Sequence, residues 1–411
     1  MLRNIMTDNL LALLCLVDGL GLPYRKPAPL VRTQGLDWTY QPDPKLYDKL
    51  RGIKKHHDDY FQGRRDKSTI PLYLFLGGAG TGKSRNAQEF HRSAALCLTE
   101  KEDRELRKSV EEAWVFHVSL EDDLSLLAEK ETDPIEAIGS RMLLQLLPDK
   151  GLRDVIQGYK EPHPMDVLKL VAKKSDVDLR SATVMLVVEG LRTFMTNSAN
   201  GCKNDSAFYR ALTNIVNLAF GDVFLMACCT ATVICPIDRA SPFVSHRYRV
   251  VLPVASLKPP RSFLNGLSKP VFDENDHVIK VLVDDCGGHG RALECLQQVV
   301  EEAGEDFNVD SLMNSLYSRL QDLYPEAMSM APNTIQAMAQ AILTRARLRP
   351  DEPLPGTTEL PGDLTIPGLV RYEQSGGLGS GGYLVAPYIW VWLFSYQPRT
   401  DVDPPLQGWR F

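Results

Sequence analysis

Short, nearly continuous apolar runs alternate with longer amphipathic segments through the middle of the chain. The runs predict buried strands at residues 70–76, 113–118, 183–188 and 223–229, with 248–254 as a candidate fifth. Apolar strands that alternate with helices are typical of a parallel sheet covered on both faces. The sequence therefore predicts an α/β domain over residues 68–256.

The segments on either side of this domain have different patterns. Residues 1–35 combine an apolar run with a connector that contains Pro and Arg, and residues 36–67 predict a polar N-terminal helix. Residues 257–346 predict a helical subdomain. Residues 347–411 predict a C-terminal winged-helix-like module and a tail, because apolar segments at 370–373 and 383–385 flank a glycine-rich turn that is typical of a hairpin.

Helix signals support this organisation. A helix is expected from about Lys83 to Cys97, directly after the first strand. Another begins at Asp133, which can cap it, followed by Pro134 in the first turn and Glu136 in a capping-box position.

The composition and net charge exclude some classes of function. The chain has 411 residues, 44% of them hydrophobic, and a formal net charge of −6. This excludes a wholly basic nucleic-acid-binding coat, although a local basic patch remains open. The eight cysteines show no CxxC or zinc spacing and are interpreted as reduced, buried thiols.

No stretch has the roughly 20 apolar residues that span a bilayer, so no membrane partner is expected. Residues 10–17 have the length of a signal-peptide core, but Asp8 and Asp18 flank them. Composition alone favours a buried strand or helix there.

One segment matches the P-loop pattern GxxxxGK[ST] in full, between a predicted strand and a predicted helix. Its glycines allow the backbone amides to surround phosphates, and Lys83 is expected to reach the β- and γ-phosphates while Ser84 binds Mg²⁺. The alternative is a chance glycine-rich turn. The expected nucleotide-binding residues are Gly77, Gly78, Ala79, Gly80, Thr81, Gly82, Lys83, Ser84 and Arg85.

Glu189 is the expected acid partner of the P-loop. It follows an apolar strand, and ligands of open α/β sheets lie at the carboxyl ends of strands. Glu189 is expected to hold Mg²⁺ and, with Lys83, to be catalytic. The residue after it is Gly190, where a second, water-activating carboxylate is usual, so we expect slow hydrolysis. The alternative is an acid that merely ends a strand.

Further candidates are weaker. Thr230 and Thr232, at the end of the next strand, either sense the γ-phosphate or are ordinary turn hydroxyls. Asp122 and Asp123 are a second possible acid pair, although a solvated loop is the better interpretation. Residues 54–59, with two histidines, are interpreted as a solvated face, with a metal-binding pair as the minor option.

Two segments outside the P-loop domain are also candidates. Residues 284–293 form a glycine-rich loop in which His289 and Arg291 either close over the nucleotide or simply begin a helix. The C-terminal aromatic residues could stack on bases, but core packing is favoured: Tyr388, Trp390 and Trp392.

The motifs resemble those of Crinkler-type effectors, secreted proteins of oomycetes and some fungi that are related to retrotransposon hot spot proteins. The resemblance extends over residues 36–395, and the P-loop is its most specific part. The matching segments are residues 38–44, 73–91, 139–147, 287–293 and 386–390.

This family is similar to the signal-transduction (STAND) branch of P-loop ATPases, in which a Cys-Gly-Gly-x-Pro-x-Ala-Leu loop contacts the nucleotide. Residues 286–293 resemble that loop, with Gly290 in place of the proline. The resemblance implies a preference for adenine, so that ATP with Mg²⁺ is expected as the cofactor, and it supports a nucleotide-sensing role for Arg291. His289 and Thr230 are further sensor candidates.

Two departures from the family change the expected biology. Residues 14–19 resemble only the start of the usual header, and the chain stops near where relatives continue into a nuclease-like or kinase-like domain. We therefore expect no nuclease activity of its own. The protein is expected to be secreted and to act in a host cell, including its nucleus, or to remain cytoplasmic if the short header prevents export.

Three functions remain open. The first is a slow ATPase switch in virulence; the second is a nucleotide-dependent module that binds a host protein or DNA with little hydrolysis; the third is a decayed paralogue. A homo-oligomer is a further possible partner. The intact P-loop disfavours the third function, and Gly190 favours the second.

Overall fold

The computed structural model describes residues 21–99, 101, 103–121, 133–159, 162–191, 207–231, 248–264, 266–304, 307–349, 352–365, 368, 370–374 and 381–395. The apolar run and the partial header near the N-terminus, and the candidates Asp122, Asp123 and Thr232, lie outside these residues.

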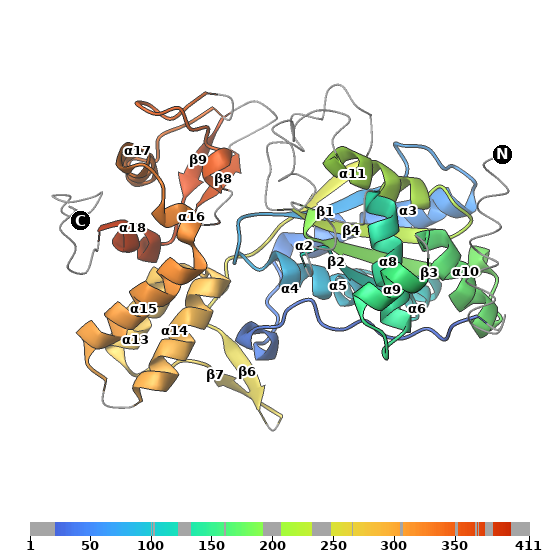
Figure 1. The fold of residues 1–411 in the computed structure, drawn as a ribbon, viewed down its shortest axis with the longest axis horizontal. Helices are drawn as coiled ribbons and strands as arrows, with labels where there is room; N and C mark the ends of the chain where they lie inside the picture. The colour runs from blue at the N-terminus through green and yellow to red at the C-terminus, as the bar shows by residue number, and fades with distance from the viewer. Residues whose placement is uncertain are drawn as a thin grey trace.

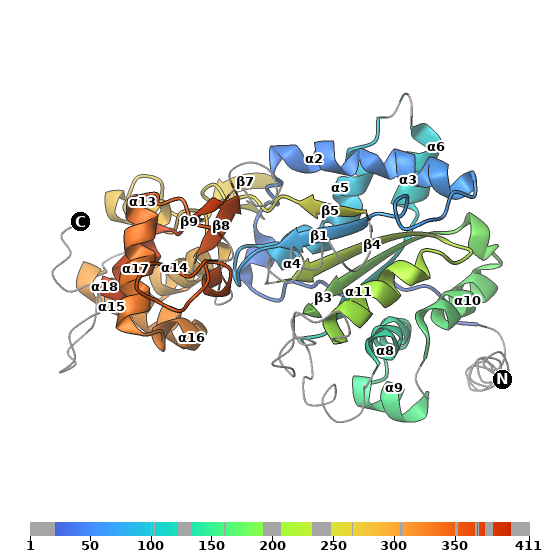
Figure 2. The same cartoon turned by 90° about the horizontal axis from the view of Figure 1, so that it is seen from above.

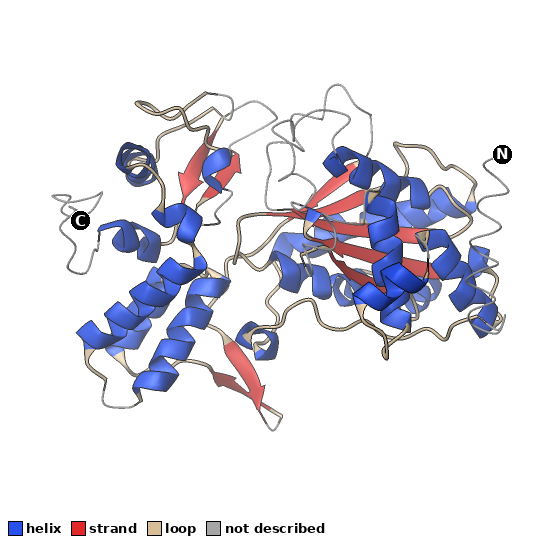
Figure 3. Cartoon of the chain, in the orientation of Figure 1, coloured by secondary structure: helices blue, strands red, loops and turns tan. Residues whose placement is uncertain are grey.

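A five-stranded parallel sheet forms the centre of the first domain (Figure 3). Its strands are β1 (Leu72–Leu76), β2 (Trp114–Ser119), β3 (Thr183–Glu189), β4 (Phe224–Ala231) and β5 (Arg249–Leu252). The spatial order is β2-β3-β4-β1-β5, and each pair is parallel. All five predicted strands, and the predicted α/β class, are confirmed.

Helices cover both faces of this sheet, giving three layers (Figure 2). The helices on one face are α2 (Pro44–Leu50), α3 (Gly52–Phe61), α5 (Phe90–Leu96) and α6 (Arg104–Glu111). The helices on the other face are α8 (Pro134–Leu146), α9 (Leu152–Gly158), α10 (Pro164–Ser175) and α11 (Ala207–Leu218). A short 3-10 helix, η2 (Leu179–Ser181), precedes β3. Alternate residues of β1 enter the two cores, Leu72 and Leu74 in one and Tyr73 and Phe75 in the other.

Two expected helices are each broken into two. The N-terminal segment holds η1 (Gln34–Asp37), then α2 and α3 with Arg51 between them. The helix after the P-loop is α4 (Lys83–Gln88) followed by α5, with Glu89 at the junction. By contrast, Asp133 caps α8 as predicted, because its side chain accepts a hydrogen bond from the Ile135 amide.

The C-terminal part is mostly helical and has its own apolar core (Figure 1). Its elements are β6 (Arg261–Leu264), β7 (Leu267–Pro270), α13 (His277–Asp285), α14 (Gly290–Ala303), α15 (Val309–Leu323), α16 (Pro325–Met328), α17 (Pro332–Leu343), η4 (Asp363–Thr365), β8 (Arg371–Gln374), β9 (Gly382–Val385) and α18 (Tyr388–Ser395). The predicted hairpin is confirmed as the antiparallel pair β8–β9. The winged-helix assignment stays a prediction.

The sequence analysis missed the antiparallel hairpin β6–β7. Its signal was present, because Asn265-Gly266 is a dipeptide typical of tight two-residue hairpin turns. Gly266 has a φ of +78°, in the left-handed region that such turns require.

An extended N-terminal connector, residues 21–30, lies along the outer edge of β2. The Tyr24 hydroxyl accepts a hydrogen bond from the Val115 amide (3.0 Å) and donates one to the Val115 carbonyl (3.2 Å). Gln145 of α8 binds the same edge, accepting from the His117 amide at 3.2 Å and donating to the Val115 carbonyl at 2.9 Å. The outward-facing polar groups of this edge are thus satisfied by side chains.

The interpretation of residues 54–59 as a solvated face is wrong in part. His56 and Asp59 are only 4% and 3% exposed, because α3 packs these positions against the sheet. The His56 ring lies 5.0 Å from the ring of Phe224, centroid to centroid. Among the described residues no group of three or more His, Cys, Asp or Glu side chains is arranged to bind a metal.

Every helix within the described ranges is too short or too polar to span a bilayer. The cysteines within the same residues are free thiols, and four of them are buried: Cys228, Cys229, Cys286 and Cys295.

The buried His56 predicts a pH-dependent stability. Burial lowers its pKa from 6.5 to about 4, so between these values the unfolded chain binds more protons than the folded protein. The contribution of His56 is therefore complete above about pH 6.5 and is lost as the pH falls. Between about pH 7.5 and 5 we expect a loss of roughly 2 kcal/mol in unfolding free energy from this residue.

Denaturant unfolding of wild type and His56→Leu at both pH values measures this effect. Carboxylates titrate equally in both proteins, so their contributions cancel in the comparison. The variant should lose about 2 kcal/mol less than wild type on acidification. An identical loss in the two proteins would show that His56 is not buried in its neutral form.

Candidate nucleotide-binding site

The P-loop motif forms a tight turn between β1 and α4. Gly80 and Gly82 have φ angles of +74° and +95°, which L side chains rarely adopt. Thr81 Oγ1 and Lys83 Nζ both donate to the Gly78 carbonyl, at 2.8 Å and 2.6 Å. The loop thus has the left-handed glycines of an anion-binding nest, and its ammonium group lies across it.

The sheet order places Glu189 beside this loop. β4 lies between β1 and β3, and all three strands end at the same edge of the sheet. The Ser84 hydroxyl donates a hydrogen bond to Glu189 Oε1, and Glu189 is only 7% exposed. A hydroxyl and a carboxylate are hard oxygen donors of the kind that Mg²⁺ prefers, so this pair fits the predicted metal.

Two hollows meet at the P-loop. The smaller, of about 120 Å³, is lined by residues 80–86, by parts of residues 31–41, and by Leu257. The larger is a groove of about 1170 Å³. Ser84 and Arg291 line both, so the two hollows adjoin at the P-loop serine.

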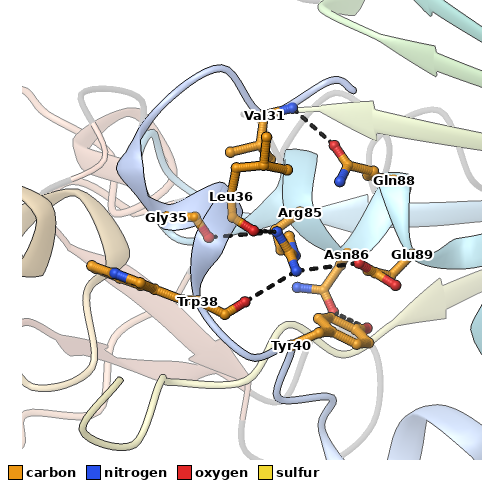
Figure 4. Close-up of polar contacts among 9 residues, drawn as sticks. All are labelled: Val31, Gly35, Leu36, Trp38, Tyr40, Arg85, Asn86, Gln88 and Glu89. Atoms are coloured by element: carbon orange, nitrogen blue, oxygen red, sulfur yellow. Dashed lines mark hydrogen bonds and ion pairs between the residues drawn. The ribbon is translucent and has the colours of Figure 1, made fainter. Parts of the chain in front are cut away.

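Residues 31–41, here called the strap, pass between the P-loop helix α4 and the helical part. Arg85 binds this strap through its guanidinium, donating to the carbonyls of Leu36 at 2.6 Å, Trp38 at 3.2 Å and Gly35 at 3.4 Å (Figure 4). Arg85 also pairs with Glu89 at 3.3 Å. That Arg85 binds nucleotide stays a prediction: its guanidinium holds the strap, and the residue also lines the smaller hollow.

Other contacts join the strap to both domains. Its Val31 amide donates to Gln88 Oε1 at 3.1 Å, and Tyr40 donates to Asn86 Oδ1 at 2.9 Å, both on the P-loop side (Figure 4). On the helical side, Glu294 of α14 accepts from the Gly35 amide at 2.9 Å. The strap is therefore a direct connection between α4 and α14.

The helical part also contacts the P-loop itself. The Arg291 amide donates to the Gly80 carbonyl at 3.2 Å, and His289 Nε2 lies 3.1 Å from the Ala79 carbonyl oxygen. Gly368 packs against the same loop, since a Cβ on Gly78 would lie 2.5 Å from Gly368 Cα. His289 and Arg291 thus lie both at the P-loop and at the start of α14, and their role toward a nucleotide stays a prediction.

His289 contacts the P-loop as a neutral ring. Its Nδ1 accepts from the Ala292 amide at 3.2 Å and so caps α14, which leaves the hydrogen on Nε2 for the Ala79 carbonyl. Burial lowers the pKa of His289 to about 4, despite the carbonyls of Ala79 and Gly368, which raise it. Trp390 packs edge-on against this ring at 5.3 Å and is 1% exposed, so the core reading of this tryptophan is confirmed.

The structure does not bring Thr230 to either hollow. Thr230 is 2% exposed on β4 and is not among the described residues that line them. Several charged residues that were not predicted as site residues line the groove, and Glu121 and Arg141 are among them. Arg141 is buried and donates to the Ser119 and Ala137 carbonyls at 2.8 Å and 3.0 Å.

No model of a known protein family matches the sequence. The chain is similar to Crinkler effector protein 108 of Phytophthora sojae, with 28% identity in an alignment 379 positions long that covers 87% of this chain. It spans less than half, 44%, of that protein's length. The predicted resemblance to Crinkler-type effectors is confirmed at the level of this relative.

Solved structures give only distant matches. An ORC2 protein of Aeropyrum pernix, in ADPNP–ADP complexes, is 11% identical with a TM-score of 0.41, and the alignment covers 87% of this chain and 94% of that one. A Drosophila ORC structure bound to DNA is 12% identical with a TM-score of 0.30, covering 90% and 95%. Likeness at this level assigns no function.

The contact between the P-loop and the helical part predicts a specific cost at Gly80. A Cβ there would lie 2.5 Å from the Tyr324 hydroxyl and 2.6 Å from both Arg291 Cβ and His289 Cε1. Gly80→Ala should therefore lose about 1–2 kcal/mol for its left-handed backbone and a further 1–3 kcal/mol or so for overpacking.

Gly63→Ala is the matched control, because Gly63 has nearly the same φ, +73°, and nothing within 4 Å of an added Cβ. In denaturant unfolding, Gly63→Ala should lose only the part of the unfolding free energy that comes from placing a side chain on a left-handed backbone. Equal losses in the two variants would mean that the helical part does not pack on the P-loop in solution.

Proposed function

We propose that this protein is an ATP-binding P-loop NTPase of STAND-like type that works as a slow ATPase switch. The observation that carries the proposal is the P-loop between β1 and α4, with the hydroxyl of Ser84 bonded to the carboxylate of Glu189. The left-handed glycines at positions 80 and 82 support it, because they give the loop the shape of an anion nest.

Each part of Mg·ATP has a place in this arrangement. The amides of residues 77–84 and the ammonium of Lys83 would hold the phosphates. The adenine would lie in the hollow between the strap and Leu257, near Arg291. Ser84 and Glu189 would hold Mg²⁺, which when bound neutralises charge on the β- and γ-phosphates.

The size of the hollow supports a switch. It measures about 120 Å³, whereas ligand pockets are usually about 300–1,000 Å³. Entry of the nucleoside into this hollow would therefore require the strap or the helical part to move. The carbonyls of Ala79 and Gly80 contact His289 and Arg291, so phosphate binding at the amides of the same loop would change this contact.

The similarity to a Crinkler effector supports an effector role in a host cell after secretion. In this proposal the ATP-bound arrangement of the strap and the helical part exposes or hides a surface for a host protein or DNA. The relative is more than twice as long as the aligned region, so its full activity is not carried over to this chain.

A second candidate is a nucleotide-dependent binding module that hydrolyses little ATP. Gly190 favours it, because the position after Glu189 carries no second carboxylate. Tight ATP retention without product in a single-turnover assay would select this candidate over the switch.

Lys83→Ala tests the proposed site. Loss of an ammonium–phosphate hydrogen bond is worth about 1.5–3 kcal/mol, so the affinity for Mg·ATP should fall roughly tenfold to a hundredfold, and phosphate release should stop. Titration calorimetry and a phosphate-release assay measure both effects. The control is Lys173→Ala, which removes an exposed lysine at the end of α10 and should change neither.

Two results would contradict the proposal. One is the absence of heat when folded wild type is titrated with Mg·ATP at millimolar concentration. The other is equal ATP binding and equal phosphate release by wild type and Lys83→Ala.

A further inference from the structure

The chain that leaves the strand next to β3 places a carboxylate beside Gly190, the residue that follows Glu189. β2 and β3 are parallel neighbours, with Ser119 opposite Glu189, and the Leu120 amide donates to the Glu189 carbonyl at 3.0 Å. The chain leaving β2 therefore runs beside the chain leaving β3. Glu121 is the second residue after β2 and lies next to Gly190.

Gly190 leaves room for the Glu121 side chain. An added Cβ at Gly190 would lie 2.5 Å from Glu121 Cγ and 2.9 Å from the Glu121 amide nitrogen. Any side chain at position 190 would displace Glu121, and the φ of +80° at Gly190 also disfavours one. The space that a side chain at position 190 would enter is thus occupied by Glu121.

Glu121 lines the groove that adjoins the P-loop at Ser84. It lines the 1170 Å³ groove together with Ser84, Glu189 and Arg291. Of these, Ser84 and Arg291 also line the hollow proposed for the nucleoside. A nucleotide that enters from that hollow would direct its outermost phosphate past Ser84 toward Glu121 and Glu189.

The two carboxylates have different surroundings and so suit different tasks. Glu189 is buried and bonded to Ser84 Oγ, which directs it toward the metal position. Glu121 is exposed to the groove and can reach water. A general base must contact the attacking water, and an exposed carboxylate at the phosphate end of the site meets that requirement.

We propose that Glu121 is the general base of ATP hydrolysis in this protein. Glu121 accepts a proton from water as the water oxygen bonds to the γ-phosphorus. The bond from that phosphorus to the β–γ bridging oxygen breaks, and its electron pair leaves with ADP. Glu121 then returns the proton to solvent. The inference rests on the proposed ATPase function and adds the residue that activates its water.

The test separates binding from turnover. Glu121→Gln keeps the size of the side chain but removes its basicity, so it should bind a fluorescent ATP analogue within about twofold of wild type while single-turnover hydrolysis falls about 10²- to 10⁴-fold. Glu121→Asp, which keeps the carboxylate, should recover part of the rate. Glu189→Gln should instead raise the Mg²⁺ concentration needed for half-maximal nucleotide binding, which Glu121→Gln leaves unchanged.

Glu112→Gln is the matched control, because its exposed carboxylate lies just before β2 and away from the groove lining. It should keep both binding and hydrolysis. If Glu121→Gln hydrolyses ATP at the wild-type rate while Lys83→Ala does not hydrolyse it, the role of Glu121 is overturned and the ATPase proposal stands. If wild type binds ATP but does not hydrolyse it, the role of Glu121 as a general base is also overturned. If wild type does not bind ATP, both proposals are overturned.

Discussion

The amide groups and the carbonyl groups of the P-loop backbone have different partners. Its left-handed glycines turn successive amides toward the space where an anion would lie, as in other backbone nests. The carbonyls of Ala79 and Gly80 instead face the helical part, where His289 and the Arg291 amide bind them. In the proposed function a single turn of chain is therefore both the binding loop and the domain contact, so that nucleotide binding would alter the contact.

The strap adds a second connection between the same two domains. Arg85 follows the P-loop serine directly, yet its guanidinium holds three strap carbonyls, and Glu294 holds the strap from the other side. Because α4 begins at Lys83, a movement of the loop would be passed to the strap within one residue of Ser84. The helical part is thus coupled to the loop by the main chain and by side chains together.

The sequence predicts the parts of this arrangement that depend on local pattern. Apolar runs identify the strands, and fixed spacing identifies the P-loop, because both are encoded within a few residues. Glu189 was also found, since it ends a strand. The prediction that residues 54–59 form a solvated face was wrong for His56, because a helix with many polar residues can still bury a histidine against the sheet.

The rest depends on pairings between distant residues. Glu121 and Gly190 meet only because β2 and β3 are neighbours, and no local pattern gives the strand order. Arg85 resembles a nucleotide ligand by position, and only the path of residues 31–41 shows its partners. The hairpin β6–β7 is different, because its Asn-Gly dipeptide is a local signal for a hairpin turn. It was not predicted because residues 257–346 were assigned to a helical subdomain.

The connector and Gln145 cover the β2 edge of the folded sheet, which among the described residues has no neighbouring strand on its outer side. An uncovered strand at the margin of a sheet is a template on which other chains can assemble into aggregates. Here the phenol of Tyr24 and the amide of Gln145 occupy the outward polar groups of Val115 and His117. The connector and α8 therefore cover this edge together, and proteolytic removal of residues 21–30 would leave, of these two, only Gln145 to block the addition of a strand from another copy.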